Sequence, residues 1–237
     1  MEDLKLSVQS GDTGLTGNLY CGLHEFWEMA FLLHFLGSDK CFVDVGANLG
    51  AYTLLASGAV QARTFSIEPV PSTFERLRQN VALNALEDRV ALLNVGVSGR
   101  DGQLRFSDGE DSSVNRVVDK SQSGIDLPVR TLDQLLQGES PSLVKVDVEG
   151  HELPLLDGAV QLLTRCPAWL IETLEHRAEI MEVFLESGFT PYAYDPFNRA
   201  LVDASAGQQN TLFVRDRSAV ESICKEAQLR SIHGVRF

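Results

Sequence analysis

The feature of this sequence that most constrains its fold is an alternation of short apolar runs with stretches of helical periodicity. Seven runs have the length of buried strands, and we predict strands at Cys41–Val45, Thr64–Ile67, Val90–Val95, Leu143–Val146, Ala168–Ile171, Thr190–Tyr194 and Thr211–Val214. Helices are predicted at Glu25–Leu36, Tyr52–Gly58, Ser72–Leu86 (opened by a capping box of Ser72 and Glu75), Leu132–Leu136, Leu153–Thr164 and from Ser218 onward. Such an alternation is typical of a mostly parallel sheet with helices on both faces. The sequence therefore predicts an α/β fold, with the last two strands as antiparallel neighbours.

Length and charge bound the number of domains and the class of partner. A chain of 237 residues with 44% hydrophobic residues can bury one good core, which predicts a single domain. The formal net charge of -13 argues against a protein that binds the phosphate backbone of nucleic acids, because such proteins display basic surfaces. No apolar run approaches the roughly 18 residues of a membrane-spanning helix, and the N-terminus has no apolar signal core. We expect a cytoplasmic protein without nucleic-acid or membrane partners.

A nucleoside-binding site is predicted where the first two strands end. The first strand runs through Asp44 into a turn, 46–50, in which Gly46 allows a tight turn and Gly50 allows close packing against the next element. Glu68 stands at the end of the second strand, where it can accept hydrogen bonds from both hydroxyls of a ribose. Ligands of such sheets bind outside the carboxyl ends of the strands. The turn and the carboxylate together favour a nucleoside cofactor over a tight loop with a solvated glutamate.

The identity of the cofactor depends on one position of the turn. The dinucleotide motif G-x-G-x-x-G needs its second glycine so that the backbone can approach a pyrophosphate. Asn48 occupies that position here, and its side chain would crowd a pyrophosphate, which S-adenosyl-L-methionine lacks. The sequence therefore favours S-adenosyl-L-methionine over NAD. An NAD-dependent oxidoreductase and a nucleoside-binding protein without catalysis remain the alternatives.

At this point the sequence resembles the FkbM family of S-adenosylmethionine-dependent methyltransferases. The resemblance rests on FVDVGANLGAYT (residues 42–53), SIEPVPSTFERLRQNVALN (66–84), TLDQL (131–135) and VKVDVEGHELPLLDGA (144–159). It extends from about Gly22 to about Val214, which is most of the chain. It implies a single Rossmann-like domain whose seven-stranded, mostly parallel sheet has the order 3-2-1-4-5-7-6, with strand 7 antiparallel. It also implies O-methylation of a hydroxyl on a small molecule or sugar.

The resemblance also implies roles for individual residues of the cofactor site. Gly46 and Asn48 would lie against the methionine end of the cofactor and Glu68 would hold its ribose, while Asn94 would border the adenine or simply form a strand-end turn. Asp44, Tyr52 and Asp147 complete the predicted cofactor-binding set.

Three parts are expected in the chain: an N-terminal segment, 1–39, whose helix covers the cofactor cleft; a core, 40–216, with a hairpin-like insertion at about 99–128; and a helical tail, 217–237.

The transfer site is predicted after the fourth and fifth strands. Methyl transfer to oxygen requires a positioned nucleophile and a group that removes its proton. His151 is the preferred general base, expected to have its pKa raised by nearby carboxylates, and the alternative is a histidine that caps the following helix. Asp147 and Glu149 are the other predicted catalytic residues. Asp147 could anchor the acceptor or the cofactor's ammonium; alternatively, Asp147 and Glu172 could bind Mg²⁺. We rank metal-independent catalysis narrowly first.

Residues on the acceptor side are predicted from three further segments. His24, Glu172 and His176 are the predicted acceptor-binding residues. The acidic loop Ser107–Ser113 is a candidate lid or a solvated surface, and Trp27 and Trp169 are predicted to lie in the core. The acceptor's identity and the oligomeric state are left open by the sequence.

Overall fold

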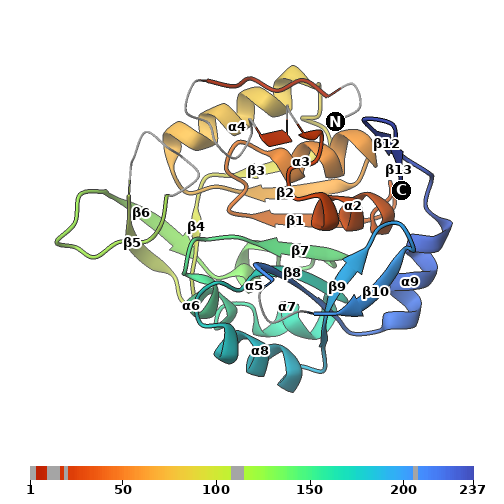
Figure 1. Cartoon of the computed structure of the whole chain (residues 1–237). Helices are drawn as coiled ribbons and strands as arrows, with labels where there is room; N and C mark the ends of the chain where they lie inside the picture. Colours follow the sequence, from red (N-terminus) through yellow and green to blue (C-terminus); the bar gives the residue numbers. More distant parts are fainter. Residues whose placement is uncertain (1–3, 10–16, 19–20, 108–114, 205–207) are drawn as a thin grey trace.

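The computed structural model of this chain describes residues 4–9, 17–18, 21–107, 115–204 and 208–237. Its centre is an eight-stranded sheet in the order β10-β9-β11-β8-β7-β1-β2-β3 (Figure 1). The strands of this sheet are β1 (Cys41–Val45), β2 (Arg63–Ile67), β3 (Val90–Leu93), β7 (Leu143–Val146), β8 (Ala168–Glu172), β9 (Thr190–Asp195), β10 (Ala200–Asp203) and β11 (Asn210–Val214). The helical elements are α2 (Phe26–Phe35), α3 (Ala51–Leu54), the π-helical turn η1 (Leu55–Ala59), α4 (Pro71–Leu83), α5 (Leu132–Leu135), α6 (Glu152–Leu156), α7 (Val160–Arg165), α8 (Arg177–Glu186) and α9 (Arg217–Glu226).

The order of the seven predicted strands is confirmed, and β10 adds an eighth strand at one edge. In the central sheet β3, β2, β1, β7 and β8 pair in parallel, whereas β11 is antiparallel to both of its neighbours, β8 and β9. The additional strand forms a hairpin with β9 through a turn in which the Asp195 carboxylate accepts hydrogen bonds from the backbone N–H groups of Phe197 and Asn198. β10 is short and half exposed, so it lacks the apolar run by which the other strands were predicted.

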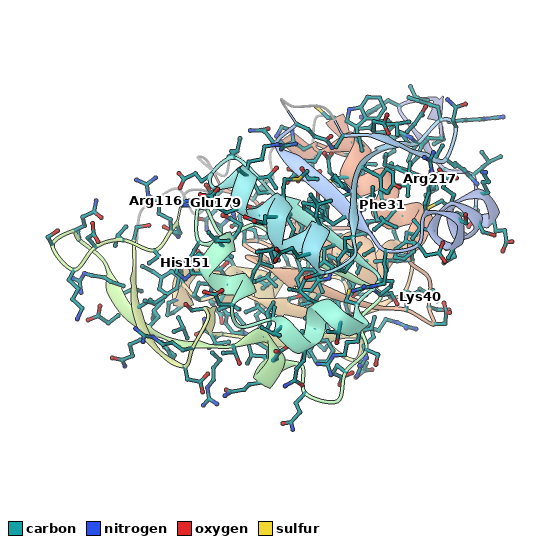
Figure 2. The ribbon with its side chains drawn as sticks, turned by 90° about the horizontal axis from the view of Figure 1, so that it is seen from below. Phe31, Lys40, Arg116, His151, Glu179 and Arg217 are labelled. Atoms are coloured by element: carbon teal, nitrogen blue, oxygen red, sulfur yellow. The ribbon has the colours of Figure 1, made fainter. Side chains whose placement is uncertain are left out.

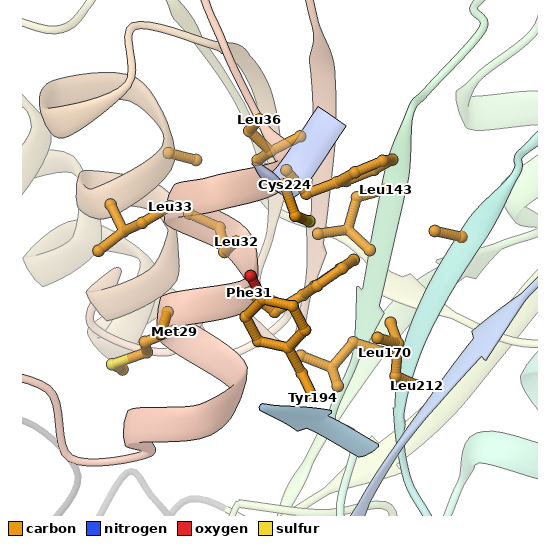
Figure 3. Close-up of a cluster of buried hydrophobic side chains, with 14 of the residues drawn as sticks. Met29, Phe31, Leu32, Leu33, Leu36, Leu143, Leu170, Tyr194, Leu212 and Cys224 are labelled. Carbon is orange, nitrogen blue, oxygen red and sulfur yellow. The ribbon is translucent and has the colours of Figure 1, made fainter. Parts of the chain in front are cut away.

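Helices cover both faces of the sheet because alternate strand residues point to opposite sides. On β1, Phe42 joins a core cluster with α2, η1 and α9, whereas Val43 and Val45 join a second cluster with α5, α6, α7 and α8. Figure 3 shows the first cluster, to which α2 contributes Phe31 and Leu32 and the sheet contributes Leu170 and Leu212. The first predicted helix is well buried, since every residue from Met29 to Phe35 is buried. No helix among the described residues is long and apolar enough to cross a membrane.

Two helices differ from the prediction for local reasons. α4 begins at Pro71 and has Val70 as its N-cap without a side-chain bond, so the predicted capping box of Ser72 is wrong. Proline is well suited to the first helical position because its φ is already helical and its missing N–H needs no partner there. The helix predicted over 153–164 is broken into α6 and α7 near Gly158, where a Cβ atom would collide with the carbonyl oxygen of Ser98.

The insertion and the C-terminal segment form small sheets of their own. β5 (Gly102–Phe106) and β6 (Ile125–Arg130) pair antiparallel, and β6 also pairs with β4 (Gly96–Val97), so the hairpin stands out at one end of the molecule (Figure 1). Most of the predicted acidic lid, residues 108–113, lies outside the described residues. The tail is helical only over α9 and then forms the hairpin β12 (Ser231–Ile232) and β13 (Val235–Arg236), which corrects the predicted helical tail.

Candidate active site

A cavity of about 340 Å³ opens at the carboxyl ends of β1, β2, β7 and β8. This is the position at which open α/β sheets bind ligands, and the volume is in the range of small-molecule sites. The structure brings most of the predicted site residues into its wall, and these are His24, Asp44, Gly46, Asn48, Tyr52, Glu68, Asp147, Glu149, His151 and Glu172. Of the two other predicted residues, neither Asn94 nor His176 lines it.

Gly46 allows the turn after β1 to approach the backbone at the end of β7 closely. Its φ is +75°, and its backbone N–H donates to the carbonyl of Ile67 at 3.0 Å. A Cβ atom at this position would collide with the backbone carbonyl oxygen of Asp147. Gly50 also has a positive φ, +94°, and a Cβ atom there would meet the Leu77 side chain at 2.6 Å. The glycines therefore permit both the turn and the close approach that the sequence predicted.

Glu68 is held at the cavity wall by the backbone of two neighbouring segments. One carboxylate oxygen accepts from the N–H of Asn48 at 3.1 Å and the other from the N–H of Val70 at 3.0 Å. The residue is only 6% exposed, and burial raises the pKa of its carboxyl to about 7 in spite of these two hydrogen bonds. Each oxygen keeps a further lone pair, so the fixed carboxylate can accept two hydroxyl groups from a ligand.

Asp44 lies on the floor of the cavity and is already engaged by the protein. The Thr53 hydroxyl donates to its carboxylate at 2.7 Å, and Thr53 is itself 2.7 Å from the Ser66 hydroxyl. Burial raises the pKa of Asp44. We infer that Asp44 shapes the floor of the site, together with Thr53 and Ser66.

Asn94 and His176 stand outside the cavity wall. The Asn94 amide donates to the backbone carbonyls of Glu68 and Pro69 at 2.8 and 2.9 Å, so it fixes the chain that follows β2. This contact matches the reading of Asn94 as a strand-end residue. His176 is exposed before α8, and its Nδ1 lies 3.6 Å from the Glu179 carboxylate.

Three carboxylates converge on the cavity from the ends of β7 and β8. An oxygen from each of Asp147, Glu149 and Glu172 lies within 4.8 Å of the others. Burial and the charge of Asp147 raise the pKa of Glu149 to about 7, and burial followed by the charges of Asp147 and Glu149 raises that of Glu172 to about 8. Glu149, whose backbone is left-handed with φ of 51°, adds a third carboxylate to the predicted pair of Asp147 and Glu172.

Lys145 is a site residue that sequence reasoning missed. It lies in the middle of β7, is 3% exposed, and its Nζ is 2.8 Å from the Asp147 carboxylate and 4.7 Å from the centre of the Tyr52 ring. Burial disfavours its charged form, but Asp147, Glu25 and Asp44 outweigh that effect and raise its pKa above the ordinary value. A single lysine within an otherwise apolar strand was the available signal, because a buried ammonium needs an acidic partner.

His151 faces the cavity beside the β4 segment, and it does not cap α6. Its Nε2 lies 3.1 Å from the Ser98 hydroxyl, and it makes no side-chain cap bond. Glu152 instead accepts from the N–H groups of Val148 and Gly150. Burial lowers the pKa of His151, so the expected increase from nearby carboxylates is wrong. The ring is therefore neutral over a wider pH range than a solvent-exposed histidine.

The rim of the cavity combines the N-terminal helix with the hairpin insertion. Glu25, directly before α2, accepts a hydrogen bond from the Asn210 amide at 3.0 Å, and both His24 and Glu25 line the cavity. The insertion contributes Phe106 and Arg116, and Figure 2 shows Arg116 and His151 at the same end of the molecule, far from Lys40 and Arg217. The predicted core position of Trp27 is wrong, because half of its surface is exposed, whereas Trp169 is buried as predicted.

The strand order and the covering helices define an α/β domain of the Rossmann-like methyltransferase class. The model of the FkbM methyltransferase domain matches residues 44–208, and the chain belongs to this family. It is 32% identical over 135 residues to the hexuronic acid methyltransferase AglP of Haloferax volcanii, covering 56% of this chain and 55% of that protein. It is 28% identical over 159 residues to the methyltransferase sdnD of Sordaria araneosa, covering 52% and 61%.

A solved structure supports the fold. The FkbM methyltransferase of Methylobacillus flagellatus superposes with a TM-score of 0.55 at 16% identity, covering 84% of this chain and 52% of that one. This chain thus spans between about half and three fifths of the length of these three proteins.

Proposed function

We propose that this chain transfers a methyl group from S-adenosyl-L-methionine to a hydroxyl group of a small molecule or sugar. The observation that carries the proposal is the fixed Glu68 carboxylate beside the Gly46 turn, in the same cavity as a neutral histidine. Membership of the FkbM family and the sugar named for the relative from Haloferax volcanii support it.

The residues of the turn fit a nucleoside that lacks a pyrophosphate. Glu68, held by the backbone N–H of Asn48, is suited to accept the two ribose hydroxyls. Asn48 lines the cavity at the position where the dinucleotide motif needs its second glycine, so its side chain disfavours a pyrophosphate there. Asp147, held by Lys145, is a suitable anchor for the cofactor's ammonium group. When bound, the cofactor supplies an electron-poor methyl group to the acceptor oxygen.

His151 is the residue we assign to proton removal. As the acceptor oxygen forms its bond to the methyl carbon and the carbon–sulfur bond breaks, the hydroxyl proton passes to the neutral ring. The Ser98 hydroxyl, 3.1 Å from Nε2, orients this ring toward the cavity. In a second mechanism, Asp147, Glu149 and Glu172 would hold a divalent cation, which would acidify the acceptor hydroxyl.

Calorimetric titration with S-adenosylhomocysteine, with NAD in parallel and with or without EDTA, tests the proposal. We expect S-adenosylhomocysteine alone to bind, with micromolar affinity or better, and EDTA to have no effect. Binding of NAD in its place, or of neither ligand, would contradict the cofactor assignment. If the cofactor binds, incubation with labelled S-adenosylmethionine and hydroxylated sugars, again with and without EDTA, tests the transfer and the role of a metal.

A further inference from the structure

Residues 4–9 form an N-terminal strap that lies along α4 (Figure 1). The N–H of Lys5 donates to the Asn84 side chain and the N–H of Ser7 to the Asn80 side chain, both at 2.8 Å. The Asn84 amide returns a bond to the carbonyl of Lys5, also at 2.8 Å. Two residues of extended chain advance by about 6.6 Å and four helical residues by about 6 Å. Side chains one turn apart on α4 can therefore reach alternate residues of the strap.

The strap also packs on the apolar cluster that lies between α4 and the turn after β1. Leu4 and Leu6 contact this cluster, to which the turn contributes Ala47 and α4 contributes Leu77. A Cβ atom at Gly58 of η1 would collide with the Leu4 side chain. The strap is thus seated in the fold by apolar contacts as well as by hydrogen bonds.

Asn80 joins the strap to the turn after β1. It is fully buried on α4, and while its Oδ1 accepts from Ser7, its Nδ2 donates to the carbonyl of Leu49 at 2.8 Å. Leu49 belongs to the turn 46–50, lines the cavity and is only 3% exposed. A buried carbonyl needs a hydrogen-bond partner, and here a side chain from a different element supplies it.

The turn has a backbone that requires support from outside. Leu49 lies between two left-handed residues, Asn48 and Gly50, with φ of 49° and 94°. Such conformations persist where the surrounding structure holds them. Glu68 holds the N–H of Asn48 from the side of β2, and Asn80 holds the carbonyl of Leu49 from the side of α4.

We propose that Asn80 is a positioning residue for the cofactor, which links the strap to the turn 46–50 and keeps the turn in the shape that receives S-adenosyl-L-methionine. The inference rests on the proposed function, which assigns the cofactor to this turn. Asn80 does not itself line the cavity and acts through Leu49. Without this contact only a fraction of the molecules hold the turn in its binding shape, and the dissociation constant rises by the inverse of that fraction.

Two asparagines of the same helix provide the test and its control. Asn84 lies one turn further along α4 and bonds to Lys5 and to the backbone carbonyl of Asn80. In calorimetric titrations with S-adenosylhomocysteine, well below the unfolding temperature, we expect Asn80→Ala to weaken binding at least about tenfold and Asn84→Ala less than about threefold. A merely structural Asn80 would lower stability alone, so an unchanged affinity, or equal weakening in the two variants, would overturn the proposal.

The strap's share is tested at Ser7, whose side chain is exposed. Ser7→Pro removes the N–H that donates to Asn80, whereas Ser7→Ala keeps it. We expect Ser7→Pro to weaken S-adenosylhomocysteine binding about threefold or more relative to Ser7→Ala. Both variants are expected to fold even if Asn80→Ala does not, and equal affinities of the two would overturn the link between strap and turn.

Hydrogen exchange in the absence of ligand measures the shape of the turn directly. The N–H of Gly50 donates to the carbonyl of Ala47 at 2.8 Å within the turn. By nuclear magnetic resonance we expect this amide to exchange at least about fivefold faster in Asn80→Ala than in Asn84→Ala, and equal rates would overturn the proposal. Failure of the wild type to bind S-adenosylhomocysteine would instead contradict the proposed function, while the exchange rates would still decide whether Asn80 holds the turn.

Discussion

The ammonium group of Lys145 lies 2.8 Å from the carboxylate of Asp147, two residues further along the chain at the end of β7. The lysine side chain is 4% exposed and the aspartate side chain 30%, so the pair spans the boundary between the core and the cavity. Lys145 and Asp44 occupy facing positions on adjacent strands, which brings a third charged group to the same place. The pair fixes the Asp147 carboxylate at the wall of the cavity.

Replacement of Lys145 by methionine is expected to destabilise the protein by about 3–5 kcal/mol. The variant leaves the carboxylates of Asp147, Glu25 and Asp44 in a poorly solvated environment without the cation that they share. Chemical denaturation measures this change. Lys120→Met, at an exposed position, is the control and is expected to change the unfolding free energy by less than about 0.5 kcal/mol. Equal stabilities of the two variants would mean that the ion pair contributes nothing.

Substitution of two glycines with similar φ angles distinguishes the cost of backbone strain from that of steric conflict. Gly46 and Gly138 have φ of +75° and +82°, but a Cβ atom collides with the Asp147 carbonyl only at Gly46 and meets nothing within 4 Å at Gly138. Gly138→Ala is expected to cost about 1 kcal/mol, and Gly46→Ala about 3 kcal/mol or more, with loss of S-adenosylhomocysteine binding. Thermal melts and calorimetry measure both, and similar losses in the two variants would refute the close approach.

Glu68 is expected to contribute directly to cofactor affinity. Glu68→Ala removes an acceptor that the backbone N–H groups of Asn48 and Val70 hold in place, so S-adenosylhomocysteine should bind more weakly by about 1.5–3 kcal/mol. Calorimetric titration checks this value. Glu87→Ala, at an exposed position, serves as control, and equal affinities of the two variants would show that Glu68 does not touch the cofactor.

The raised pKa of Glu68 also predicts a pH dependence of stability in the absence of cofactor. The folded protein holds this proton up to a pKa of about 7, whereas the ordinary value is 4.5, so the folded state binds more protons between these limits. Its contribution to stability is therefore lost as the pH rises from about 4.5 to 7. Relative to the wild type, Glu68→Gln should gain about 1–3 kcal/mol between pH 4.5 and 8 in denaturant titrations. A difference independent of pH would contradict the burial of an ionisable group here.

The sequence predicted those parts of the fold and site that depend on local pattern. Apolar runs located the strands, and the spacing of Gly46 and Glu68 placed both at neighbouring strand ends, which parallel pairing brings together. Features that arise from tertiary packing were missed. The direction of the His151 pKa shift depends on its burial, the exposure of Trp27 depends on what covers α2, and the position of β10 depends on a hairpin with β9. Lys145 was missed because two of its partners are distant in the sequence: Asp44 lies on β1 and Glu25 directly before α2.

Replacement of His151 by alanine distinguishes a proton acceptor from a structural histidine. His151 is close to the Ser98 hydroxyl but caps no helix, so its loss should leave stability and S-adenosylhomocysteine affinity nearly unchanged. Turnover should fall by about 10²–10⁴-fold, the usual contribution of a positioned general base. Ser98→Ala removes only the orienting contact, so we expect a smaller decrease in kcat with unchanged affinity. Single-turnover rates with labelled S-adenosylmethionine, beside calorimetric affinities, measure both. If His151→Ala lowered affinity and turnover by equal factors, the side chain would be supporting the cavity wall.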